Sequence, residues 1–252
     1  MNKEVKVFLR KLKIYGLART LYYKSKSLLQ LLVQKVNVAD IEGEIVSNYI
    51  QSHEVRKLQL GCGNHIIEGW LNSDYLPDNP NILNLDVTKP FPIEDHQIDY
   101  IFSEHMIEHI NYSEGNYMLS ECYRVLRNGG KVRISTPDMR YLIDLYNDEK
   151  TEIQKRYLTL IIDYLGLKVT PGQENIFVIN QAFYGWGHKF IYNEGVLRDS
   201  MEKNGFTNIV RCELNQSKVD VLRNLENETR FPEGLLKLET FTLEGTKLLP
   251  VS

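Results

Sequence analysis

The sequence predicts an α/β protein built on a mostly parallel sheet. Short apolar runs alternate with amphipathic segments, a glycine-rich turn follows the first apolar run, and polar residues stand where several runs end. Because parallel strands finish at one edge of a sheet, we expect these polar residues to meet there and form a ligand site. The length of 252 residues suffices for one such domain with an insertion, and a composition of 42% hydrophobic and 25% charged residues is typical of a globular protein.

Residues 1–53 are predicted to form a basic, amphipathic helical arm. Residues 1–36 hold nine Lys or Arg and one acid, Glu4, so this segment carries +8 and leaves −11 for the rest of a chain whose total is −3. Apolar residues recur between the charges, and again over residues 40–53, at helical spacing. Such an arm suits an anionic membrane surface, or it packs on the domain or on a second subunit. No nucleic-acid partner is expected, because the acidic remainder would repel phosphates.

The segment 56–75, RKLQLGCGNHIIEGWLNSDY, is the centre of the predicted site. A strand ending at Leu60 runs into the turn Gly61-Cys62-Gly63, where bare backbone admits a ligand and N–H groups attract an anion. The next residues have room for about two helical turns, and Asp74 then ends the second strand, where a carboxylate can accept hydrogen bonds from a ribose. An ordinary turn, with Asp74 as a capping or turn acid, is the alternative.

Further strands and helices follow in order. Apolar runs predict strands at 82–85, 99–102, 131–135, 208–212 and 236–248, and helical spacing predicts helices at 113–126 and 194–204. The first three of these strands end at Asp86, Ser103 and Asp138. Residues 138–192 exceed what the sheet needs, and we expect them to form a helical cap over the active site. The main domain is thus predicted to span residues 54–252.

Several of these segments together resemble a known family. The turn LQLGCGN, Asp74 and Asp86 after the next two strands, IDYIFSEHMIEHI and ECYRVLRNGGKVRISTPD are similar to the class I S-adenosylmethionine-dependent methyltransferases, in particular the type 11 group. The resemblance covers residues 56–138 and, loosely, 188–213. It implies a Rossmann-like sheet of seven strands, the last antiparallel, and S-adenosyl-L-methionine as cofactor. One departure is the short interval from Gly63 to Asp74, which implies an abbreviated first crossover helix and weakens the ribose role of Asp74.

The resemblance also implies site residues. Those expected to bind the cofactor are Leu60, Gly61, Cys62, Gly63, Asp74, Asp86, Val87, Ser103 and Glu104. A catalytic base is needed only if the acceptor is a hydroxyl or a similarly weak nucleophile. His105 is the first candidate by position, with His188 and Asp138 as further ones, although each histidine can equally be a hydrogen-bonded structural group. His109 is expected to face solvent or core.

Residues of the predicted cap suggest a class of methyl acceptor. The aromatic residues Tyr184, Trp186 and Tyr192, together with the basic arm, lead us to hypothesise a small molecule, specifically a glycan or lipid-linked saccharide methylated at a hydroxyl during polysaccharide biosynthesis. No apolar run approaches the ~20 residues that span a bilayer, and no secretory pattern opens the chain. We therefore expect a cytoplasmic enzyme, peripheral on the inner face of the membrane, with its oligomeric state left open.

Other classes of protein share parts of the pattern. The run from His105 to His109 matches H-x-x-E-H, the zinc-ligand pattern of inverted zinc peptidases. A nicotinamide-dependent reductase also has a strand, a glycine turn and an acid, but its third glycine would fall at Ile66. A catalytically silent relative that binds the cofactor is a third alternative. Cys62, Cys122 and Cys212 lack disulfide or metal spacing, and no metal ligand is assigned in the methyltransferase interpretation.

Overall fold

The computed structural model describes residues 38–231 and 234–248. Contacts divide the chain into two compact units, Met1–Glu44 and Ile45–Ser252, and the sheet with its surrounding helices belongs to the second. The basic arm expected at residues 1–36 lies outside the described residues. In the part of the chain that is described, no helix has the length and apolar character needed to cross a membrane.

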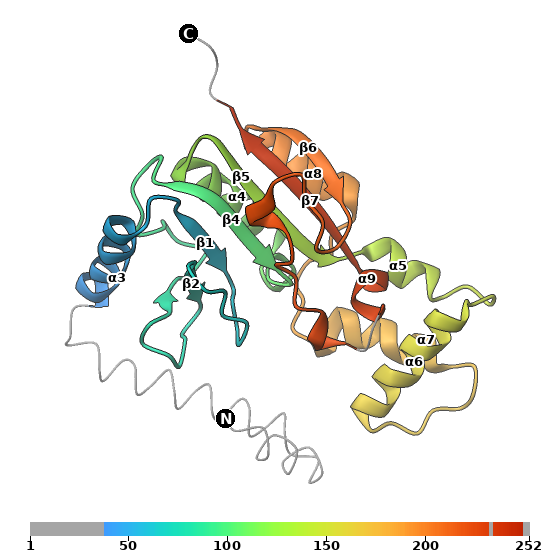
Figure 1. The fold of residues 1–252 in the computed structure, drawn as a ribbon. Helices are drawn as coiled ribbons and strands as arrows, with labels where there is room; N and C mark the ends of the chain where they lie inside the picture. Colours follow the sequence, from blue (N-terminus) through green and yellow to red (C-terminus); the bar gives the residue numbers. More distant parts are fainter. Residues whose placement is uncertain (1–37, 232–233, 249–252) are drawn as a thin grey trace. The chain divides into compact units, whose positions relative to one another are not determined.

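The second unit is built on a seven-stranded sheet of order β3-β2-β1-β4-β5-β7-β6 (Figure 1). Its strands are β1 (Lys57–Leu60), β2 (Leu71–Asp74), β3 (Leu83–Asn84), β4 (Ile98–Glu104), β5 (Leu126–Pro137), β6 (Phe206–Cys212) and β7 (Thr240–Lys247). Strand β7 pairs antiparallel with both β5 and β6, while the other paired strands are parallel. The predicted seven-stranded sheet with an antiparallel last strand is confirmed.

The centre of the sheet is buried on both faces. Leu58 of β1 stands opposite Leu71 of β2 and Ile101 of β4, and none of the three side chains is more than 4% exposed. Parallel strands covered on both faces need continuous apolar character, which explains why short apolar runs marked these strands in the sequence.

Three of the helices are those that the sequence predicts: α3 (Val38–Ser52), α4 (Tyr112–Val125) and α8 (Glu194–Lys203). Helix α4 begins with a capping box, in which Asn111 Oδ1 accepts from the Glu114 N–H at 3.0 Å and Glu114 Oε2 accepts from the Asn111 N–H at 2.8 Å. Helices α4 and α8 contact each other and lie on the same side of the sheet in Figure 1.

The connection from β1 to β2 differs from the prediction. Residues 61–70 form turns and no helix, so a parallel pair of strands is joined by only ten residues. Trp70 instead packs with Phe102 of β4 and with Leu222 and Leu225, which belong to the long segment between β6 and β7. That later segment covers apolar surface where a crossover helix usually lies.

Two strand boundaries also need correction. Strand β4 continues through Glu104 and does not break at Ser103, because these two residues pair with Ile134 and Ser135 of β5. The run 236–248 is not one strand. It opens with the short helix α9 (Leu235–Glu239), whose first two leucines are buried, and only then becomes β7.

The segment between β5 and α8 is helical, as expected. It contains α5 (Met139–Asp144), α6 (Glu152–Leu165), α7 (Glu174–Asn180) and the π-helical turn η2 (Gln181–Gly185). Tyr157, Leu158 and Ile161 of α6 share a second hydrophobic cluster with Val178 of α7 and Leu235 of α9. Figure 1 shows these helices beyond the end of the sheet at which β4 and β5 finish. Their function as a cap stays a prediction.

Candidate active site

Two cavities adjoin the segment that follows β4. The smaller has a volume of about 520 Å³ and the larger about 740 Å³. His105, directly after β4, and His109, at the end of the 3₁₀ turn η1 (Ile107–His109), line both of them. The two cavities therefore share a wall, and molecules bound in each would be neighbours across these two side chains.

The smaller cavity collects four of the nine residues predicted to bind the cofactor: Gly61, Asp74, Asp86 and Val87. They come from the ends of β1 and β2 and from the loop after β3, as expected of ligand sites at the carboxyl edge of a parallel sheet. The other five do not line it: Leu60, Cys62, Gly63, Ser103 and Glu104.

The glycine turn has the backbone that the sequence implies, although its two glycines act differently. Gly61 has φ +68° and Gly63 has φ +54°, a region that side chains other than glycine rarely adopt. A Cβ atom on Gly61 would overlap the Met106 side chain, whereas one on Gly63 would meet nothing within 4 Å. The bare backbone at Gly61 is thus packed against Met106, and the open space lies at Gly63.

The two acids of the smaller cavity have structural hydrogen bonds as well. Asp74 Oδ2 accepts from the Gly63 N–H at 2.5 Å, which ties the end of β2 to the glycine turn. Asp86 Oδ1 accepts from the Thr88 N–H at 3.0 Å and from the Thr88 hydroxyl at 2.6 Å. The turn-acid interpretation therefore holds for both residues, and both also border the cavity.

The predicted residues outside the cavity are largely buried. Leu60 belongs to the main core, and the Cys62 thiol is also buried. The Ser103 hydroxyl is buried and has no hydrogen-bond partner among the described residues. Glu104 accepts from the Asn227 N–H at 3.0 Å, and burial raises its pKa to about 7 against the opposing effect of Arg230.

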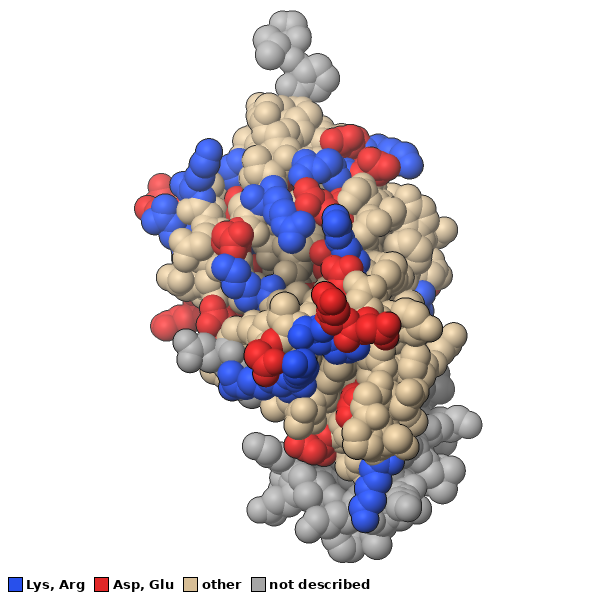
Figure 2. Space-filling view, turned by 90° about the vertical axis from the view of Figure 1, so that its right-hand side faces the viewer, with Lys and Arg blue, Asp and Glu red and all other residues tan. Residues whose placement is uncertain are grey.

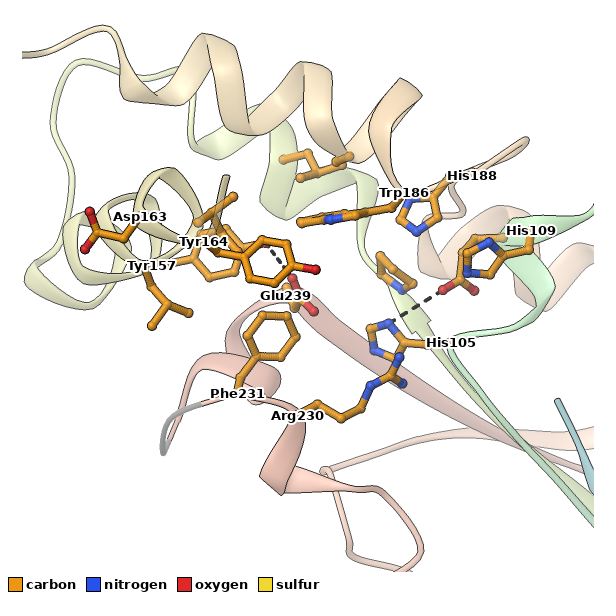
Figure 3. A pocket seen from close by; sticks show the side chains of 16 residues that line it. His105, His109, Tyr157, Asp163, Tyr164, Trp186, His188, Arg230, Phe231 and Glu239 are labelled. Atoms are coloured by element: carbon orange, nitrogen blue, oxygen red, sulfur yellow. Dashed lines mark hydrogen bonds and ion pairs between the residues drawn. The ribbon is translucent and has the colours of Figure 1, made fainter. Parts of the chain in front are cut away.

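The larger cavity lies between the segment after β4, the cap helices and the segment before α9. Figure 3 shows His105, His109 and His188 grouped at one end and Tyr157, Tyr164 and Phe231 toward the other. Of the three aromatic residues expected in the substrate site, only Trp186 lines this cavity. Tyr184 is 82% exposed, and Tyr192 is fully buried beside Tyr112 and Phe190.

The three predicted catalytic residues have different surroundings. His105 Nε2 lies 2.7 Å from Thr240 Oγ1, its Nδ1 lies 3.5 Å from Glu108 Oε1, and burial lowers its pKa well below the ordinary value. His188 Nδ1 is buried without a hydrogen-bond partner among the described residues, and burial lowers the pKa of this histidine to about 4. Asp138 caps α5 by accepting from the Arg140 N–H at 3.0 Å and lines neither cavity.

Two buried carboxylates and one histidine of the larger cavity were not predicted. Glu108 is 0% exposed and accepts from the Thr136 hydroxyl at 2.9 Å, and burial raises its pKa to about 7. Glu239 accepts from the Tyr157 hydroxyl. His109 is exposed, which is one of its two expected environments, and it also lines both cavities, which was not predicted. The sequence marked Glu108 and His109 only through the H-x-x-E-H match, and Glu239 only as an acid within an apolar run.

The zinc-peptidase motif does not adopt the helix that it needs. His105 has φ +48° and precedes a single 3₁₀ turn, so it does not share a helical face with His109.

The comparison with protein families decides between the alternatives. Residues 68–134 match the family described as "Methyltransferase domain". The matched range runs from just before β2 into β5, and it includes Asp74, Asp86 and the segment from His105 to His109. Over these residues the chain matches a methyltransferase domain. This match supports neither the reductase nor the peptidase interpretation. It begins after the glycine turn, so it does not include Gly61 and Gly63.

Solved structures similar to this methyltransferase share little of its sequence. A SAM-dependent methyltransferase from Archaeoglobus fulgidus is 15% identical, with 92% of this chain and 99% of that chain covered and a TM-score of 0.44. One from Mesorhizobium loti is 15% identical, with coverages of 77% and 91% and a TM-score of 0.46. The CurJ carbon methyltransferase is 12% identical, with a TM-score of 0.42. The alignment covers 79% of this chain but only 50% of the CurJ chain. Among curated proteins, none matches this sequence.

Proposed function

We propose that the enzyme binds S-adenosylmethionine in the smaller cavity and methylates a hydroxyl group of a small molecule held in the larger one. The observation that supports this arrangement is the wall that the cavities share at His105 and His109. Methyl transfer requires donor and acceptor in line and in contact, so two adjacent cavities suit it better than one closed pocket.

The residues of the smaller cavity fit the parts of this cofactor. The carboxylates of Asp74 and Asp86 would accept hydrogen bonds from the ribose hydroxyls and the adenine amino group, while Leu85 and Val87 offer apolar surface to the adenine ring. The bare backbone at Gly61, which lines this cavity, would face the amino-acid end. When bound, the cofactor supplies a methyl group on a positively charged sulfur, which becomes a neutral thioether as the acceptor hydroxyl loses its proton.

We assign the acceptance of that proton to His105. It lines both cavities, and its low pKa keeps the imidazole neutral at pH 7. Its Nε2 is hydrogen-bonded to the Thr240 hydroxyl, and its Nδ1 lies 3.5 Å from Glu108 Oε1. His105→Asn is expected to lower the rate of methyl transfer about 10²-fold or more while cofactor affinity is retained. His188 stays a second candidate for contact with the acceptor, whereas the helix-capping position of Asp138 argues against a catalytic role for it.

Calorimetry tests the cofactor assignment directly. Wild-type protein should bind S-adenosylmethionine and its demethylated product but not a nicotinamide dinucleotide, and Asp74→Ala should weaken the binding of both sulfur compounds. Asp95→Ala, which removes an exposed acid bonded to Arg124, is the matched control and should bind as wild type does. Nicotinamide binding without binding of the sulfur compounds would overturn the proposal.

For the acceptor we propose a glycan or lipid-linked saccharide precursor of a polysaccharide. The aromatic side chains of Tyr164, Trp186 and Phe231 line the larger cavity and would stack on sugar rings. On the face drawn in Figure 2, basic and acidic side chains are intermixed, which favours a small acceptor over a polyanion. Mass spectrometry of a panel of saccharides incubated with enzyme and cofactor tests this, and methylation confined to amines would contradict it.

We propose further that residues 1–36 hold the enzyme at the cytoplasmic face of an anionic membrane, because their +8 charge is combined with apolar residues at helical spacing. Co-sedimentation with anionic vesicles should fall when five of the basic residues of this segment are replaced by Gln in the full-length chain. Equal sedimentation of both proteins would contradict the membrane contact.

A further inference from the structure

We propose that Glu108, His109 and His188 bind a divalent transition-metal ion, of the Zn²⁺ or Mn²⁺ kind, at the end of the larger cavity. One ligand atom from each residue lies within 4.8 Å of those from the other two. The rings of His109 and His188 are 5.0 Å apart between centroids and meet edge to face. Figure 3 shows both histidines at the same end of the cavity as His105.

Two polar atoms of this group lack hydrogen bonds among the described residues. Glu108 is 0% exposed, and its Oε1 has only His105 Nδ1 nearby, at the ion-pair distance of 3.5 Å. His188 Nδ1 is also buried and has no hydrogen-bond partner in the described part of the chain. Leaving a buried polar atom without a partner costs about 1 to 3 kcal/mol, and native proteins keep such atoms mainly where a ligand or a function uses them. A cation in the cavity would satisfy this carboxylate and this imidazole together.

The donor set suits a transition metal. Two imidazoles and one carboxylate are a common set for zinc and for other first-row divalent ions, and they leave positions open to water or substrate. The second oxygen of Glu108 is fixed by the Thr136 hydroxyl at 2.9 Å, as outer-shell partners of metal-bound carboxylates often are. The ligand atoms must approach each other to reach metal bonds of about 2.0 to 2.2 Å.

The set differs from that of the H-x-x-E-H motif, which would use His105 and His109 as its pair of histidines. In the structure, His105 Nε2 is bonded to Thr240 on β7, and the second histidine of the group comes from the loop after η2. The topology of the fold, and not the five-residue run, brings the three ligands together.

The role of the ion rests on the proposed function. An open coordination position would take the acceptor oxygen, and a vicinal diol of a saccharide would bind through two oxygens. The coordinated hydroxyl would pass its proton to His105, and an oxygen electron pair would form the bond to the methyl carbon. The electron pair of the carbon–sulfur bond that breaks stays on the sulfur atom. Coordination makes a hydroxyl more acidic and so eases this step.

Metal titration of the full-length chain, dialysed first against a chelator, tests the site. Calorimetry with Zn²⁺ and electron paramagnetic resonance with Mn²⁺ should show one ion per chain. Glu108→Gln and His109→Ala should each weaken binding at least about tenfold. His109 is exposed, so its variant should fold even if the buried Glu108→Gln does not. The matched controls are Glu94→Gln and His53→Asn, which lie outside both cavities.

Wild-type protein that binds no ion, or a His109→Ala variant that binds ions as wild type does, would overturn the site. Affinity for S-adenosylmethionine is measured on the same samples. Loss of metal binding with cofactor binding intact rejects only the metal site, whereas wild-type protein that fails to bind the cofactor rejects the proposed function.

Discussion

The Tyr157 hydroxyl donates a hydrogen bond of 2.5 Å to Glu239 Oε2, in the wall of the larger cavity. Glu239 is 6% exposed. Burial raises its pKa to about 7, while the hydrogen bond from Tyr157 and the charge of Arg230 act in the opposite direction. A carboxyl group at this position therefore changes its charge near neutral pH, and stability depends on pH through it.

The raised pKa predicts a loss of stability between about pH 4.5 and pH 7. In that range the folded protein keeps a proton on Glu239 that the unfolded chain releases, so the free energy of unfolding falls as pH rises and levels off above pH 7. In Glu239→Gln, the fall in the free energy of unfolding over this pH range should be smaller by about 3 kcal/mol. Urea unfolding from pH 5 to pH 8 measures it. Glu152→Gln, at an exposed position, is the control. A variant as pH-dependent as wild type would contradict the assignment.

The glycine turn predicts unequal effects of alanine at its two glycines. Gly63→Ala should cost about 1 to 2 kcal/mol through its positive φ. Gly61→Ala should cost about 1 to 3 kcal/mol more, because its Cβ also overlaps Met106. Combining Gly61→Ala with Met106→Ala should recover that extra part in a double-mutant cycle of thermal unfolding, whereas simple additivity would show that Met106 is not the obstacle.

We predict a large loss of stability when the Arg133 side chain loses its guanidinium group. It is fully buried and bonds Glu226 Oε1 at 2.7 Å and Glu244 Oε1 at 2.6 Å. Arg133→Met leaves two buried carboxylates without their cation and should cost about 3 to 5 kcal/mol in urea unfolding. Lys155→Met breaks an exposed pair with Glu152 and should cost less than about 1 kcal/mol. Similar losses in the two variants would contradict the importance of burial.

Because Asp138 caps α5, we predict that substituting it lowers stability and leaves cofactor binding unchanged. Asp138→Ala should lower the free energy of unfolding by about 1 kcal/mol, because α5 loses its cap, while Asp138→Asn should retain most of that stability. Cofactor affinity, measured by calorimetry, should be unchanged in both variants. A weakened affinity in the stable Asp138→Asn protein would return this residue to the binding site.

The sequence predicts what local patterns determine and misses what distant segments bring together. Strands β1 and β5 and helix α4 carry their own apolar periodicity and caps, and the glycine turn has the positive φ angles that its composition implies. The partner of His105 is 135 residues away at Thr240, and no local pattern shows it. Glu239 and Arg133 likewise depend on partners at least 82 residues away. The region after Gly63 was expected to have room for about two helical turns, but it forms turns, because Trp70 packs on Leu222 and Leu225, which no local pattern shows.

The cluster that joins Trp70 and Phe102 to Leu222 and Leu225 makes the early strands depend on a late segment. While the chain emerges from the ribosome, the Trp70 indole would lack its contacts with Leu222 and Leu225, and that part of its apolar surface would be open to other chains. Folding can be completed only after the stretch before β7 has been synthesised. The nascent half-sheet is thus the stage at which this protein would most need a chaperone.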